Sequence, residues 1–154
     1  MKRKTIQILA VSALLVGLAP MAFAGEAGGH NLVVTKPAMT TELPNGISYT
    51  SIGTHQVCLT TDPANPMNRA SGDCDGACVA SADGEATCMG SCTWVDGDGD
   101  VAFFTWDGAQ EGNWSLQGGT GKYAEASGQG TWKTDGFYAG GITGNTWQGT
   151  IEMP

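Results

Sequence analysis

The sequence predicts an all-β fold, a single eight-stranded antiparallel barrel, on three observations. Glycine accounts for 24 of the 154 residues. Short runs rich in Thr, Val, Trp, Tyr and Phe lie between clusters of Gly, Asp and Asn, which is typical of short strands joined by tight turns. The later runs alternate apolar and polar residues, so each strand has one dry face and one wet face. Such a meander closes its edges most simply as a barrel, and a β-sandwich is the alternative.

Residues 1–24 are expected to be a cleavable signal peptide. A basic start at residues 2–4 precedes an apolar run at 6–18, and Ala22 and Ala24 are the small residues that cleavage requires. The apolar run is shorter than the roughly 20 residues that span a bilayer. We therefore expect an exported protein, periplasmic or extracellular, with no membrane span in the mature chain.

The mature chain is strongly acidic. It keeps four basic residues against fifteen acidic ones, a formal charge of −11. A field of this sign repels nucleic-acid phosphates and anionic headgroups, so no nucleic-acid partner is expected. Acidity of this kind favours solubility outside the cell, and no pattern indicates the oligomeric state.

Residues 25–45 are expected to form an N-terminal arm or an irregular first strand, because Pro37 and Pro44 limit regular pairing. The β-barrel domain then occupies 46–154. Its predicted strands are 47–52, 55–61, 73–80, 86–95, 101–107, 112–118, 128–134 and 145–152. The longest connection, 62–72, is polar with two prolines and is expected to be a surface loop.

Four cysteines lie symmetrically about an Asp-Gly turn signal at Asp83. If the hairpin is centred there, Cys78 faces Cys88 and Cys74 faces Cys92. Residues four apart occupy the same class of pair, and the closer, non-hydrogen-bonded class suits disulfides. An oxidising compartment makes two such disulfides consistent with export.

The resulting disulfide hairpin, 73–95, has one competing interpretation. The same four thiols are a candidate zinc site, although structural zinc sites favour tighter spacings. Cys58 is left over, either as a buried thiol or as one that pairs between molecules.

The acidic run places Asp96, Asp98 and Asp100 at alternate positions, as at the start of an EF-hand calcium loop. The glycine required at the sixth position is Val101, and strands flank the run. We therefore favour a polar turn. A weak extracellular calcium site is the alternative, and no other cofactor is expected.

Four tryptophans are predicted to point to one interior: Trp106, Trp114, Trp132 and Trp147. They either fill the barrel as ordinary core or line a cavity for a small apolar or aromatic ligand.

Catalytic groups are scarce. His30 and His55 belong to no Ser/His/Asp or metal motif, so an enzyme is not the favoured interpretation.

The segment 118–130, GGTGKYAEASGQG, resembles the GGTG-x-[YF]-x-x-A-x-G stretch of the allene oxide cyclase and dirigent group. The preceding DGDGDVAFFTW run and the closing Trp-x-Gly pattern are similar to small exported bacterial proteins of that barrel type, mostly uncharacterised. The resemblance covers residues 94–152 and implies an eight-stranded barrel with an apolar interior. Gly119 and Gly121 are expected to permit positive φ, and Tyr123 to anchor the loop. No activity follows from the fold.

Together these observations predict a non-catalytic exported barrel that binds a small apolar ligand or an envelope partner. One alternative is a cyclase-like or isomerase-like enzyme that acts on a lipid-derived substrate inside the barrel. The other is a structural or adhesion component.

Overall fold

The structure, a computed structural model, describes residues 23–154, so the predicted signal peptide lies almost wholly outside the described residues. Two 3-10 turns, η1 (Pro44–Gly46) and η2 (Gly121–Tyr123), accompany the strands. The strands are β1 (Phe23–Thr35), β2 (Met39–Glu42), β3 (Ser48–Cys58), β4 (Ser71–Ala80), β5 (Ala86–Val95), β6 (Val101–Asp107), β7 (Glu111–Gly119), β8 (Ser127–Tyr138) and β9 (Ile142–Met153). In this part of the chain no helix is long and apolar enough to cross a bilayer.

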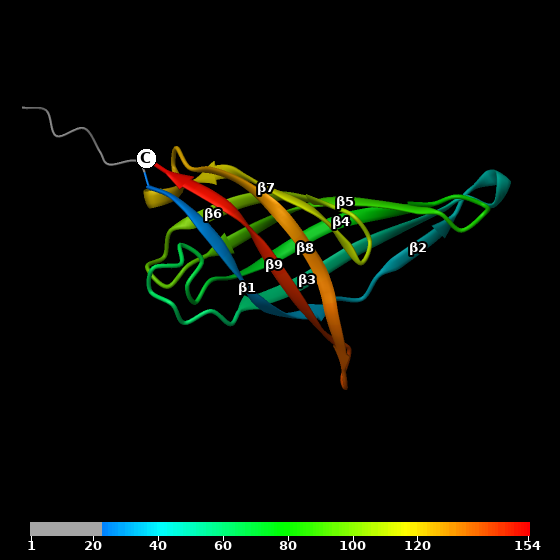
Figure 1. Cartoon of the computed structure of the whole chain (residues 1–154). Coiled ribbons are helices and arrows are strands. Elements are labelled where there is room, and N and C mark those ends of the chain that lie inside the picture. Colours follow the sequence, from blue (N-terminus) through cyan, green and yellow to red (C-terminus); the bar gives the residue numbers. More distant parts are fainter. Residues whose placement is uncertain (1–22) are drawn as a thin grey trace, which may run out of the picture.

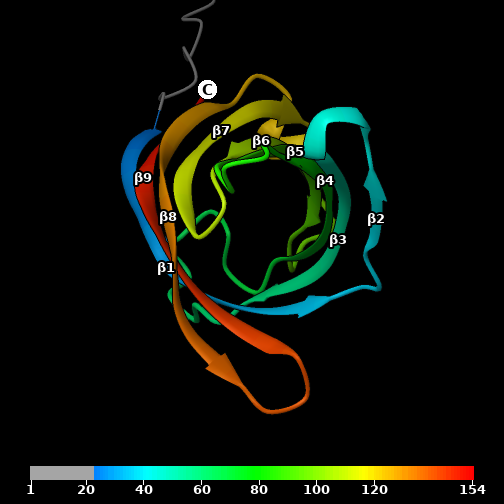
Figure 2. The same ribbon diagram turned by 90° about the vertical axis from the view of Figure 1, so that its right-hand side faces the viewer.

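The strands close into a barrel, as Figure 2 shows in a view down the ring. From β3 to β9 each strand pairs with the next in antiparallel fashion, and β1 pairs with both β9 and β3. Eight strands therefore form the wall, while β2 pairs only with β3 and lies outside the ring. The predicted eight-stranded antiparallel barrel is confirmed, and the β-sandwich alternative is wrong.

The N-terminal segment closes the barrel and is not an arm. Strand β1 pairs with β9 along most of its length, and its residues 31–35 also pair with β3. The two prolines that limit regular pairing lie after β1, at Pro37 and Pro44. Closure satisfies the backbone groups of both edge strands at once, which a separate arm would leave exposed.

The predicted strands 47–52 and 55–61 are one continuous strand, β3. Gly53 does not interrupt it, because Gly53 and Thr54 continue the ladder to Asp75 and Cys74 of β4. The strand ends at Cys58, where the chain leaves the sheet for the connection to β4. Other predicted strand bounds differ from the observed ones by a few residues.

The cysteine hairpin has the expected register and both expected disulfides. Cys74 faces Cys92 and Cys78 faces Cys88, each pair bonded with a Cα–Cα distance of 4.0 Å. These four residues therefore offer no thiolate to zinc. Cys58 is a free, buried thiol.

Inward-facing glycines make room for the indole rings in the barrel. A Cβ on Gly90 would lie 2.7 Å from the Trp106 ring, and one on Gly76, directly opposite on β4, would lie 2.6 Å from it. Trp114 lies in the same way against Gly130, at 2.5 Å. Glycine on neighbouring strands thus lets each large ring lie against bare backbone, because the interior has no room for a second side chain at that level.

The two ends of the barrel differ. The β4–β5 hairpin and the β2–β3 connection project beyond one end, and the long β3–β4 connection lies at the other (Figure 1). Cys74 and Cys92 line the cavity, whereas Cys78 and Cys88 lie nearer the β4–β5 turn and outside the lining.

Candidate functional site: a tryptophan-lined cavity

A cavity of about 220 Å³ occupies the barrel interior. Trp106, Trp114, Trp132 and Trp147 all line it, so the structure brings together the four tryptophans that sequence alternation placed on one side. The same four residues also belong to the hydrophobic core or pack against it, so a ligand-binding role for them stays a prediction. The sequence patterns themselves do not separate the two roles.

The aromatic rings hold one another edge to face. Trp106 and Trp132 have ring centroids 6.3 Å apart, and Trp114 and Trp147 have them 6.0 Å apart. Phe104 stands edge-on to Trp114 at 5.8 Å. Edge-to-face pairs of this kind fix ring orientation as well as adding attraction. The aromatic wall is therefore preorganised.

Three of the four indole N–H groups are already used inside the protein. Trp114 and Trp132 each donate to a backbone carbonyl, at 3.2 and 2.9 Å, and Trp147 donates to Asn31 Oδ1 at 3.1 Å. Trp106 Nε1 is buried, and no residue in the described part of the chain accepts its hydrogen. A donor without a partner in a dry site costs free energy unless something else accepts from it.

The cavity also contains amide side chains that the sequence analysis missed. Asn31 is 8% exposed, and its Nδ2 donates to Gln56 Oε1 at 3.3 Å. Asn145 Oδ1 is buried and accepts from none of the described groups. The alternation of β9 was the available signal for Asn145, because it lies two residues before Trp147 and so shares its inward face.

None of the side chains around the cavity is ionisable. Cys74 and Cys92 lie in its wall but are joined as a disulfide. Cys58 is outside the lining, and burial raises the pKa of its thiol, which keeps it protonated and unreactive at neutral pH. The cavity can thus surround a small molecule and hydrogen-bond to it, but its wall has no general acid or base.

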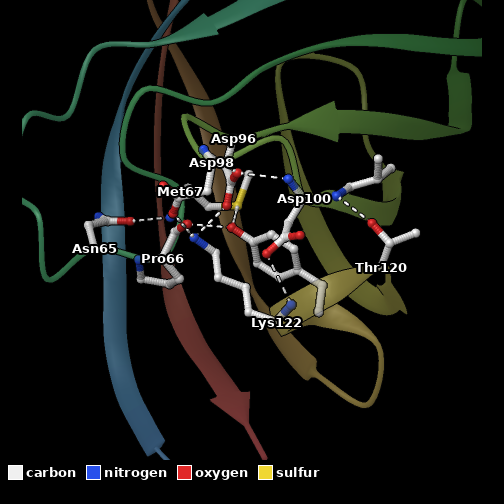
Figure 3. A network of polar contacts seen from close by, with 10 residues as sticks. Asn65, Pro66, Met67, Asp96, Asp98, Asp100, Thr120 and Lys122 are labelled. Atoms are coloured by element: carbon white, nitrogen blue, oxygen red, sulfur yellow. Dashed lines mark hydrogen bonds and ion pairs between the residues drawn. The ribbon is translucent and has the colours of Figure 1, made fainter.

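The connection between β3 and β4 closes one end of the cavity. Met67 and Ala70 are buried while residues 62–64 and Arg69 are exposed, so the connection 62–72 is a surface loop only in part. Tyr123 of η2 is fully buried and donates its hydroxyl hydrogen to the Pro66 carbonyl (Figure 3). Its hydroxyl also lies 3.7 Å from Met67 Sδ, and Met67 reaches the cavity lining. The tyrosine thus ties this connection across the barrel end.

Of the two glycines near η2 that were expected to have positive φ, only Gly121 does. Gly121 has a φ of 52°, as expected, but the second positive value belongs to Gly118, at 101°, and not to Gly119. Gly119 is required for a different reason, because a Cβ there would lie 1.9 Å from the Val101 carbonyl oxygen. Close backbone approach, and not dihedral freedom, selects glycine at this position.

The acidic turn beside Tyr123 surrounds a lysine. Asp96 Oδ1 accepts from the N–H groups of Asp98 and Asp100, and its Oδ2 pairs with Lys122 Nζ. Lys122 Nζ lies 3.3 Å from Asp98, and Asp100 accepts from the Lys122 N–H at 3.1 Å (Figure 3). Between residues 23 and 154 no three potential ligands gather as a metal site. A weak calcium site at this turn stays a prediction.

Neighbouring charges and hydrogen bonds shift the pKa values of three side chains at this turn, Asp96, Lys122 and Tyr123. Burial acts to raise the pKa of Asp96, but the hydrogen bonds from Lys122 and from the two backbone N–H groups outweigh it and lower the pKa. Burial acts to lower the pKa of Lys122, and the two carboxylates raise it. Burial and the neighbouring carboxylates together raise the pKa of Tyr123, so its hydroxyl stays protonated and donates.

The two histidines lie away from the cavity. His55 contacts Asp73 at 3.1 Å, and His30 contacts Asp135 at 3.3 Å. Both imidazoles are exposed on the outer wall of the barrel. Neither lines the cavity.

Comparison with known proteins points to the fold. No protein-family model and no curated protein matches the sequence. The pterocarpan synthase dirigent proteins GePTS1 and PsPTS1 are similar in structure, with TM-scores of 0.54 and 0.52. The chain has a dirigent-like barrel. The matches cover 86% and 85% of this chain and 86% and 95% of the two structures, at 14% and 13% identity, which shows the fold alone.

The likeness confirms the coarser part of the predicted resemblance, a barrel like that of the dirigent proteins. The allene oxide cyclase grouping and a bacterial origin stay predictions. The two disulfides are consistent with an exported protein.

Proposed function

We propose that this chain is a non-catalytic, exported barrel that binds a small, uncharged, largely apolar molecule in its tryptophan-lined cavity. The observation that carries the proposal is an interior cavity of about 220 Å³ whose wall is aromatic and amide-bearing with no ionisable side chain. Pockets of this kind, mostly apolar with a few placed polar groups, are what small-molecule binding sites share.

Binding is favoured over catalysis by the chemistry of the wall. Acid–base catalysis requires a titratable group within hydrogen-bond reach of the reacting atom. The wall offers amides, hydroxyls, a disulfide and indoles, none of which titrates near neutral pH. The similar structures are pterocarpan synthase dirigent proteins by name, which supports a small molecule as the ligand but does not distinguish binding from catalysis. A cyclase-like enzyme acting on a lipid-derived substrate would need a polar reacting group that this wall lacks.

A protein partner at the envelope and a structural or adhesion role are the weaker alternatives. Both would use the outer surface and would leave the cavity without a purpose. The two disulfides and the predicted signal peptide support an extracytoplasmic site of action, periplasmic or extracellular.

The test is a native mass spectrum of the mature chain, purified from the exported fraction without reducing agent. We expect a second peak, heavier than the chain by one discrete small molecule. The matched variants are Thr143→Trp, which fills the cavity from the inner face of β9, and Gln148→Trp, which places the same side chain on the exposed outer face of that strand.

The heavier peak should vanish in Thr143→Trp and persist in Gln148→Trp. A bare mass in the wild type, together with no quenching of its tryptophan fluorescence by small aromatic molecules, contradicts the proposal. The four tryptophans would then be structural core only.

A further inference from the structure

We propose that the tip of the β8–β9 hairpin, residues 136–142, is a docking surface for a lipid bilayer with zwitterionic headgroups. Two aromatic side chains of the tip enter the headgroup region, while the barrel stays in water. This docking goes beyond the binding function above, because it uses the outside of the molecule and needs no ligand in the cavity.

Two aromatic side chains are exposed at this tip. Phe137 is 77% exposed, more than any other large hydrophobic side chain among the described residues, and Tyr138 is 57% exposed. The end of the hairpin stands clear of the ring of strands (Figure 2). Aromatic rings are enriched where lipid meets water, and burial of such rings in the interface drives weak, reversible membrane binding. The tip therefore has the side chains and the position of a membrane contact.

The two rings lie on opposite faces of the hairpin. Phe137 is paired with Thr143, whose side chain lines the cavity, so Phe137 belongs to the inner face. Tyr138 lies across the outer face, because a Cβ on Gly144 would be 3.1 Å from its ring and one on Gly136 would be 3.2 Å from its hydroxyl. A flat protein surface covers only one face of a hairpin. A lipid interface surrounds an inserted tip and buries both rings.

The tip is uncharged. The run 136–151 contains no charged residue, in a mature chain with a formal charge of −11. The first carboxylate below the tip, Asp135, accepts a hydrogen bond from Thr146 and contacts His30 at 3.3 Å on the outer wall. Insertion of the tip therefore desolvates no charge, while the acidity of the rest of the chain disfavours an anionic surface. This charge distribution favours zwitterionic headgroups.

The β4–β5 turn, at the same end of the barrel, has a different composition. Residues 81–85 include two carboxylates and no aromatic ring. Its polar groups bond to one another, since Ser81 donates its hydroxyl hydrogen to Asp83 and the Gly84 N–H donates to the Ser81 carbonyl at 2.9 Å. The two hairpins point in different directions (Figure 1). The aromatic tip can thus enter lipid while the acidic turn remains in water.

The tip lies beside one end of the cavity. The cavity lining includes Gly108 and Ala109 of the β6–β7 turn and Thr143 at the base of the tip. These residues are at the end of the barrel opposite to the β3–β4 connection. Docking through the tip brings this end of the cavity close to the lipid surface, where largely apolar molecules concentrate.

The experiment is cosedimentation of the mature, oxidised chain with phosphatidylcholine vesicles, without added ligand. We expect the wild type to sediment with the vesicles at high lipid concentration. Phe137→Ser should weaken the partitioning about tenfold and Tyr138→Ser about threefold, because each removes an apolar ring from the contact. Phe103→Ser is the matched control, since it removes an exposed ring from the outer face of β6, and it should sediment like the wild type.

Two further measurements sharpen the test. Phe137→Trp keeps a large ring at the tip and should bind phosphatidylcholine at least as tightly as the wild type. Phosphatidylglycerol vesicles should bind the wild type more weakly than phosphatidylcholine vesicles at low salt, and the difference should shrink at high salt, because salt screens the repulsion. Circular dichroism checks that each variant folds, and Phe137→Ser removes little packing because its side chain is mostly exposed.

The proposal is overturned by a wild type that stays in the supernatant, by Phe137→Ser that sediments like the wild type, or by tighter binding to phosphatidylglycerol. It is also overturned by a dimer in the native mass spectrum that becomes a monomer in Phe137→Ser, since the tip is then a contact between copies. The small-molecule peak in that spectrum is measured without vesicles. Failure of the docking surface therefore leaves the binding function standing, and a bare mass contradicts only the binding function.

Discussion

The closed end of the barrel and the cavity wall differ in how many of their buried polar atoms have a hydrogen-bond or ion-pair partner. At the closed end, the Tyr123 hydroxyl donates to Pro66 and the Asp96 carboxylate pairs with Lys122, with Asn68 Oδ1 as the exception. In the cavity wall, the buried atoms Trp106 Nε1 and Asn145 Oδ1 lack partners among the described residues. Paired buried groups hold a structure in one conformation, whereas each unpaired one costs free energy. We therefore expect changes at the closed end to act on stability and changes in the cavity to act on binding.

The largest effect is expected from Tyr123→Ala at the closed end. Removing a fully buried ring that ties the β3–β4 connection to η2 should lower the free energy of unfolding by about 3–5 kcal/mol. Urea denaturation followed by tryptophan fluorescence measures it. Tyr123→Phe, which keeps the ring and leaves the Pro66 carbonyl unpaired, should cost about 1–2 kcal/mol. A loss below about 1 kcal/mol for Tyr123→Ala would show that this end is not a structural closure.

The next effect comes from the two disulfides. Replacing either pair by serine should cost roughly 2–3 kcal/mol of unfolding free energy, slightly more for 74–92 because it closes the longer loop. The two disulfides should differ more clearly in their effect on ligand binding, since only Cys74–Cys92 lies in the cavity wall. We expect its removal to weaken binding as well, and removal of 78–88 to change stability alone. Equal effects of the two on binding would contradict this.

A glycine behind the Trp114 ring gives a smaller effect. In Gly130→Ala the new Cβ would lie 2.0 Å from the Gln148 carbonyl oxygen and 2.5 Å from the Trp114 ring. The overpacking should cost about 1–3 kcal/mol and displace the ring into the cavity, which weakens binding. Gly53→Ala is the matched control, because its Cβ would meet only flexible Lys36 atoms and Asp75 at 3.2 Å or more. Thermal unfolding and ligand titration of both variants test the difference.

The smallest effect is expected from Lys122→Met, about 1–2 kcal/mol near neutral pH, because Lys122 is partly exposed while the Asp96 side chain is only 1% exposed. The folded-state pKa of Asp96 lies below its usual 3.8, so its stabilisation is present above that pH and is lost as the pH falls through the folded-state value. Unfolding midpoints measured from pH 7 to pH 2 should fall less steeply in Lys122→Met than in the wild type. Parallel curves would mean that this ion pair does not stabilise the closed end.

The dependence of stability on pH in the alkaline range follows from the pKa of Lys122. The pKa of Lys122 is raised above 10.5, so its contribution is complete below that pH and is lost as the pH rises through the folded-state value. Wild-type stability should therefore decline above about pH 10.5 more than that of Lys122→Met.

The sequence by itself determined the local features of this protein. Period-two alternation placed the four tryptophans on one face, because a strand allows only two side-chain directions. The Asp-Gly turn fixed the hairpin register, and with it the pairing of Cys74 with Cys92 and of Cys78 with Cys88. These features depend on residues close together in the chain, whose geometry the backbone restricts.

Only the tertiary structure determined the contacts between segments that lie far apart in the chain. It joined β1 to both β3 and β9, over up to about 130 residues of chain. It placed Lys122 against Asp96, and so gave the acidic turn a lysine as its neighbour. It also determined which indole N–H finds an acceptor and which does not, since that depends on the packing of several strands at once. Alternation shows that Trp106 points inward, and only the closed barrel shows that its N–H has no partner there.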